Sequence, residues 1–115
     1  MVIFMKKRES IKPNIDIPIR KIESFCQANH IQALALFGSV LTERFKKSSD
    51  VDVLVQFDGQ HIPGLIRISE LELELGEIFG RHVDLRTPKD LSRYFRDEVI
   101  TGAYRLYGKE RFHSS

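Results

Sequence analysis

Apolar positions along the chain recur with two different spacings, and each spacing predicts a different kind of element. In residues 15–29 they recur every three or four positions, with Asp16 placed as an N-cap and Pro18 in the first turn. Residues 63–79 carry a similar apolar stripe, and Gly80 directly after it suits a helix C-cap. Both segments are therefore predicted to be amphipathic helices.

Three shorter segments have the pattern of strands. Residues 31–37 are almost continuously apolar and end at Gly38, which is typical of a strand buried on both faces. Residues 51–57 are rich in valine and alternate in part between apolar and polar positions. In residues 82–86, Val83 and Leu85 point to one face and Asp84 to the other. The chain is thus predicted to contain three strands separated by helices.

The remaining segments complete the predicted order. Residues 39–45 are expected to form a short helix or turn, and residues 46–49 a polar loop. The sequence Thr87-Pro88-Lys89-Asp90 has the N-cap, the first-turn proline and the acidic third residue that begin a helix, here predicted to run to Gly108. The order α-β-α-β-α-β-α indicates an α/β fold with one small sheet flanked by helices, and the pattern leaves the strand directions open.

Length and composition narrow the class of protein. With 115 residues, the chain suits one domain, predicted over residues 15–112, preceded by a basic flexible arm over residues 1–14. The net charge of +2 gives no argument for direct nucleic-acid binding, and no apolar run is long enough to span a membrane. A single cysteine, Cys26, excludes an internal disulfide. We expect a cytoplasmic protein, with Cys26 as a core residue.

The residues with the clearest chemical pattern are Gly38-Ser39 and the pair Asp50 and Asp52. Glycine at a strand end allows a sharp turn and close backbone approach to a ligand, and Ser39 adds a hydroxyl, which together suit a phosphate. Two residues apart at the start of a strand, Asp50 and Asp52 project from the same face. Such close carboxylates repel unless a cation lies between them, and carboxylate oxygens favour Mg²⁺ or Mn²⁺.

Asp84, on the next predicted strand, can complete this acidic group. Three carboxylates can hold two metal ions, one activating an attacking hydroxyl and the other stabilising a leaving phosphate. The predicted reaction is therefore phosphoryl or nucleotidyl transfer. Singly, each feature also fits a solvated strand end or an ordinary loop, so the prediction depends on their ordered combination. Without a cation, the mutual repulsion of Asp50, Asp52 and Asp84 is expected to oppose folding.

In this combination, from about Ile19 to Phe112, the sequence resembles the minimal nucleotidyltransferases of the polymerase-beta-like nucleotidyltransferase superfamily. The resemblance implies an α/β fold with a small mixed sheet. It assigns Gly38 and Ser39 to the triphosphate of ATP, and Asp50 and Asp52 to two Mg²⁺ ions. It assigns Asp84 to the ion that activates the acceptor hydroxyl.

The resemblance also implies a function. Minimal nucleotidyltransferases of this size resemble antitoxins paired with a HEPN-domain toxin, which implies AMP transfer from ATP to a tyrosine of that toxin. Many members carry Ala-Arg-Gly after the Gly-Ser pair, whereas this chain has Val40-Leu41-Thr42-Glu43-Arg44. Two alternatives therefore stay open: an antitoxin that acts by binding with little or no catalysis, and a nucleotidyltransferase for a small molecule or RNA completed by a separate chain.

Overall fold

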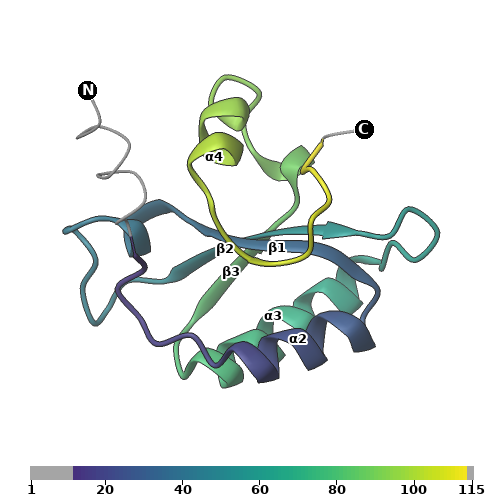
Figure 1. The fold of residues 1–115 in the computed structure, drawn as a ribbon, viewed down its shortest axis with the longest axis horizontal. Helices are drawn as coiled ribbons and strands as arrows, with labels where there is room; N and C mark the ends of the chain where they lie inside the picture. The colour runs from purple at the N-terminus through teal and green to yellow at the C-terminus, as the bar shows by residue number, and fades with distance from the viewer. Residues whose placement is uncertain (1–11, 114–115) are drawn as a thin grey trace.

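The structure is a computed structural model that describes residues 12–113, so most of the predicted N-terminal arm lies outside the described residues. Figure 1 shows a sheet with two helices along one face and a shorter helix on the other. The elements in chain order are α2 (Ile19–Ala28), β1 (Ile31–Phe37), a 3₁₀ turn (Gly38–Leu41), β2 (Val51–Phe57), α3 (Leu65–Phe79), β3 (Val83–Arg86), a second 3₁₀ turn (Pro88–Asp90), α4 (Arg96–Gly102) and β4 (Tyr104–Tyr107).

The four strands form one mixed sheet in the order β3-β2-β1-β4. The central pair, β1 and β2, is antiparallel, and β4 adds antiparallel to the other edge of β1. β3 runs parallel to β2, as expected for two strands joined through the crossover helix α3. The predicted α/β class and small mixed sheet are confirmed.

The two faces of the sheet are covered differently. The main core lies between the sheet and helices α2 and α3, where Leu36, Val53 and Leu75 are fully buried. A smaller cluster on the opposite face packs Ala35 and Leu54 against Phe112, beside α4 (Figure 1). Because side chains alternate along a strand, Asp52 lies on the same face as Leu54 and not in the main core. The partly uncovered face therefore holds the acidic residues.

The first helix begins later than its apolar pattern predicts. It starts at Ile19, Pro18 occupies the N-cap position, and the predicted N-cap role of Asp16 is wrong. Proline disfavours helical backbone in the residue before it, so Ile17 stays outside the helix. The residues before α2 still pack: Ile15 and Ile17 contact the main core.

The prediction of one long C-terminal helix is wrong. Thr87 and Asp90 do form the predicted capping pair, but they begin only a single 3₁₀ turn. The later helix α4 ends at Gly102, and residues 104–107 form β4. These residues satisfy the hydrogen-bonding groups of a β1 edge that would otherwise be open.

The end of β4 depends on one glycine. Gly108 has a φ of 81°, and a Cβ there would overlap the backbone carbonyl of Gln32 in β1. By contrast, the predicted C-cap of α3 is confirmed, because Gly80 adopts the left-handed conformation with a φ of 70°. Within residues 12–113, none of the helices is both long enough and apolar enough to cross a membrane.

Candidate active site

The predicted phosphate turn lies at the end of β1, against β2. Gly38 has a φ of 79°, a conformation that favours glycine, and begins the 3₁₀ turn Gly38–Leu41, which Val40 anchors in the main core. A Cβ on Gly38 would overlap Oδ2 of Asp52. The glycine is therefore required both by its backbone conformation and by the close approach of the Asp52 carboxylate.

The strand register brings the central predicted residues together. Asp52 is opposite Phe37 in the antiparallel pairing of β1 with β2, and opposite Asp84 in the parallel pairing of β2 with β3. The Gly38 turn, Asp52 and Asp84 thus lie on three neighbouring strands at one end of the sheet. Asp50 precedes β2 by one residue and is exposed.

Two of the three carboxylates have basic partners. Oδ1 of Asp50 lies 3.1 Å from Nδ1 of His82, a pair that is ionic when the imidazole is protonated. Asp84 accepts two hydrogen bonds from Arg86, from Nε to Oδ1 and from Nη2 to Oδ2, each 3.1 Å long. The repulsion expected among the three carboxylates is therefore not wholly unrelieved, because the Arg86 guanidinium offsets part of the charge of Asp84.

Asp52 is the carboxylate under the greatest electrostatic cost. Its partial burial raises its pKa above the ordinary value, and the nearby charges of Asp84 and Asp50 raise it further, while Arg86 opposes them. Both effects favour the neutral acid, or a bound cation beside the ionised form. Burial is the larger cause of this shift, and the two neighbouring acids add to it.

The donor set fits magnesium held together with a substrate, rather than a closed protein cage. Within residues 12–113, no three His, Cys, Asp or Glu side chains are already arranged to hold a metal ion. Mg²⁺ commonly binds through one or two carboxylates, with water and substrate phosphates as its other ligands. Asp50 and Asp52 supply such oxygens, and Gly38 lets the backbone approach the Asp52 carboxylate closely.

Sequence reasoning missed two residues that fix the loops of the site. Nη2 of Arg81 donates hydrogen bonds to the carbonyls of Lys46, Lys47 and Ser49 at 2.7, 2.9 and 2.9 Å, and its guanidinium lies 4.3 Å from the Phe45 ring centroid. This one side chain thus ties the loop before Asp50 to the start of β3. An arginine after a glycine C-cap carries no sequence signal for such a role.

The second missed residue is Asn14, at the end of the predicted arm. Its side-chain amide donates to the carbonyls of Val40 and Thr42 at 2.9 and 2.8 Å, and its backbone N–H donates to Val40. Asn14 therefore holds both ends of the segment that follows Gly38-Ser39. This role of Asn14 depends on contacts with residues far away in the sequence, which periodicity does not reveal.

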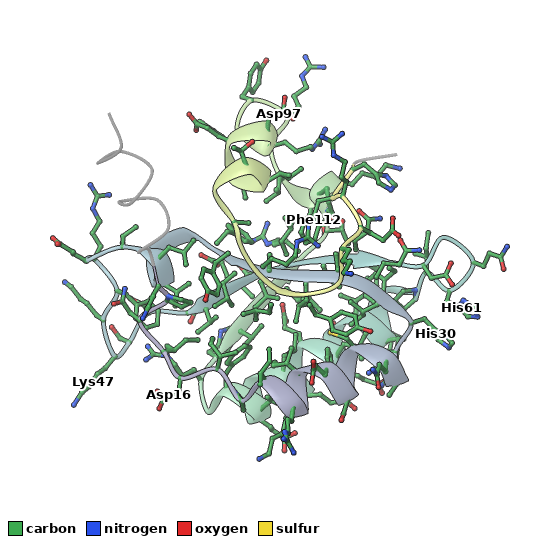
Figure 2. The ribbon with its side chains drawn as sticks, in the orientation of Figure 1. Asp16, His30, Lys47, His61, Asp97 and Phe112 are labelled. Carbon is green, nitrogen blue, oxygen red and sulfur yellow. The ribbon has the colours of Figure 1, made fainter. Side chains whose placement is uncertain are left out.

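Cys26 and the basic residues of the loop before Asp50 have simpler positions. Cys26 is fully buried in the main core, as predicted, and burial raises the pKa of its thiol to about 12. Arg44, Lys46 and Lys47 are exposed on the loop after the 3₁₀ turn. Figure 2 shows Lys47 at the outer end of that loop, pointing away from the sheet.

A glycine turn and paired carboxylates at one end of a mixed sheet suit the metal-assisted transfer of a phosphate-bearing group. Residues 20–112 match the family described as Polymerase beta, Nucleotidyltransferase, and the chain belongs to this family. The resemblance to minimal nucleotidyltransferases seen in the sequence is thereby confirmed.

Two relatives carry protein adenylyltransferase names. The chain is 31% identical, over 78% of its own length and 95% of the relative, to a provisionally assigned protein adenylyltransferase of Methanocaldococcus jannaschii. It is 40% identical to protein adenylyltransferase MntA of Thermococcus cleftensis over a shorter stretch, 48% of this chain and 54% of that protein.

Solved structures show the same fold. A toxin-antitoxin crystal structure with AMP-PNP superposes with a TM-score of 0.66 at 25% identity, covering 82% of this chain and 76% of the other. A complex of tri-AMPylated Shewanella oneidensis HEPN toxin with MNT antitoxin gives a TM-score of 0.58 at 26% identity, covering 79% and 70%.

Proposed function

We propose that this protein is an antitoxin that transfers AMP from ATP to a tyrosine of a cognate HEPN toxin, with Mg²⁺ as cofactor. The observation that carries the proposal is the placement of the Gly38 turn against Asp52, with Asp84 in register on the next strand. The names of the relatives and the AMPylated toxin in a similar complex support the choice of nucleotide and acceptor.

In the proposed reaction, the tyrosine oxygen attacks the α-phosphorus of ATP. The bond from that phosphorus to the bridging oxygen of the β-phosphate breaks, pyrophosphate leaves, and the phenolic proton passes to solvent or to a site carboxylate. Bound Mg²⁺ supplies positive charge to the phosphates and lowers the pKa of the acceptor hydroxyl. Asp50 and Asp52 would hold the two ions, and Asp84 would be a ligand of the ion that activates the acceptor hydroxyl.

The Gly38 turn places its backbone and the Ser39 hydroxyl beside the triphosphate. Gly38 is exposed and Ser39 half-buried, so both can be reached from solvent. The departure from Ala-Arg-Gly leaves Thr42, Glu43 and Arg44 exposed next to this turn. Of these three residues, Arg44 is the one that carries positive charge.

That departure favours one alternative, an antitoxin that acts by binding with little or no catalysis. The two functions are separated by incubating the protein with the cognate toxin, Mg²⁺ and ATP labelled at the α-phosphate. Transfer predicts label and an added AMP mass on a toxin tyrosine, which the Asp52→Asn variant fails to produce. Inhibition of the toxin without any change in its mass would instead establish the binding antitoxin.

A further inference from the structure

Arg86 lies next to the acidic group and is exposed to solvent. It is the last residue of the edge strand β3 and lies opposite Leu54 in the pairing with β2, two positions from the Asp52–Asp84 pair. Side chains two apart on a strand share a face, so Arg86 lies on the face that carries Asp52 and Asp84. Its guanidinium engages both oxygens of Asp84.

This pairing conflicts with metal binding at Asp84. A guanidinium within hydrogen-bonding distance of a carboxylate repels any divalent cation that approaches the same group, and the repulsion is greatest in a partly desolvated site. Asp84 is only about one-third exposed, so water screens this repulsion incompletely. While Arg86 remains in place, Asp84 is therefore a poor metal ligand.

The charges at the site agree with a single ion before nucleotide binds. With all three acids ionised, Asp50, Asp52, Asp84 and Arg86 together carry two net negative charges, which one divalent cation balances. A second cation needs further negative charge, which a triphosphate brings. Phosphate is also the group that can replace a carboxylate in a two-pronged contact with arginine.

We propose that Arg86 is a positioning residue that pairs with Asp84 in the resting protein and transfers to the nucleotide's phosphates when ATP binds, which frees Asp84 for the second ion. The inference rests on the proposed function and adds an order of events to it: one ion first, then nucleotide together with the second ion. Arg86 would also supply positive charge to the triphosphate, in a chain that lacks the arginine of the Ala-Arg-Gly sequence.

Two other basic side chains close to the acidic group already have partners. Arg81 donates to three carbonyls of the loop before Asp50. His82 pairs with Asp50, at the other end of the acidic group from Arg86. Among residues 12–113, Arg86 is the arginine that donates to a carboxylate of the site.

The test counts Mn²⁺ ions bound to the full chain by electron paramagnetic resonance of the free ion, with and without AMP-PNP. For the parent we expect one ion without nucleotide and two with it. Arg86→Met should bind the second ion without nucleotide, and its affinity for AMP-PNP should fall about tenfold or more, because a lost hydrogen bond to a charged group weakens binding by at least that factor. Arg86→Lys, which keeps the charge, should stay close to the parent in ion count.

The control is Arg67→Met on α3, which breaks another 3.1 Å arginine–carboxylate pair, with Glu70, on the opposite face of the sheet. It should match the parent in every measurement. Unchanged ion counts and nucleotide affinity in Arg86→Met would overturn the role of Arg86 and leave the proposed function standing. If the parent binds no Mn²⁺ even with AMP-PNP, both proposals fail together.

Discussion

At the scale of single residues, the site is built around Asp52. It is flanked by the Gly38 turn on one neighbouring strand and by Asp84 on the other. Asp50 and Asp84 each have a basic partner, whereas the pKa of Asp52 is raised by burial and by its acidic neighbours. Asp52 therefore bears the electrostatic cost of bringing these acids together, and a cation would relieve it.

We expect Asp52→Asn to abolish AMP transfer and to raise the melting temperature of the metal-free protein at neutral pH. The folded state raises the pKa of Asp52, so ionisation of this group opposes folding. That cost is absent below its unfolded pKa and complete above its folded pKa. Thermal melts across pH should show parent and variant converging in acid and separating as pH rises; a variant less stable than the parent at neutral pH would contradict this.

Gly38→Ala should damage both stability and function. A left-handed backbone costs a residue with a Cβ about 1–2 kcal/mol, and here the added methyl also overlaps the Asp52 carboxylate. We expect lower unfolding free energy in urea and loss of AMP transfer. Gly59→Ala is the matched control, because a Cβ there has no atom within 4 Å. Equal stability of the two variants would show that the close approach at Gly38 is not required.

At the scale of elements, the sequence pattern predicted the strands and helices that depend on contacts between residues near one another in the chain. The three strands and the helix capped by Gly80 follow from periodicity and one glycine. Alternation along a strand puts Asp50 and Asp52 on one face, whereas Asp84 could be added only through the ordered combination of motifs. The fourth strand could not be predicted in this way, because β4 forms only by pairing with the distant edge of β1. The roles of Arg81 and Arg86 likewise depend on partners that only the folded chain brings together.

The loop before Asp50 should depend on Arg81. Because this side chain donates to three loop carbonyls, Arg81→Met should make trypsin cut after Lys46 and Lys47 faster than in the parent. Arg67→Met, which also removes one arginine, is the control and should leave the cutting rate unchanged. Cleavage as slow as in the parent would mean that other contacts hold the loop. Limited digestion followed by mass spectrometry measures both rates.

At the scale of the whole molecule, the two faces of the sheet are arranged differently. Helices α2 and α3 close one face over the main core, while the other face carries the acidic residues and is covered only in part by α4 and the segment around Phe112 (Figures 1 and 2). In the proposed function, the toxin tyrosine would approach the open end of this face, away from the main core. If the proposed function holds, toxin binding and toxin modification would therefore depend on different parts of the chain.

Substitution of all three acidic residues should separate binding of the toxin from its modification. A variant combining Asp50→Asn, Asp52→Asn and Asp84→Asn keeps the shapes of the side chains and removes the charges that hold metal. We expect it to remain folded, to co-purify with the toxin, and to leave the toxin's mass unchanged. If AMP transfer is how the toxin is silenced, cells expressing both proteins should then stop growing, whereas the parent protects them. Continued growth with an unmodified toxin would show that binding alone neutralises it, and the acidic residues would lose their place in the antitoxin's function.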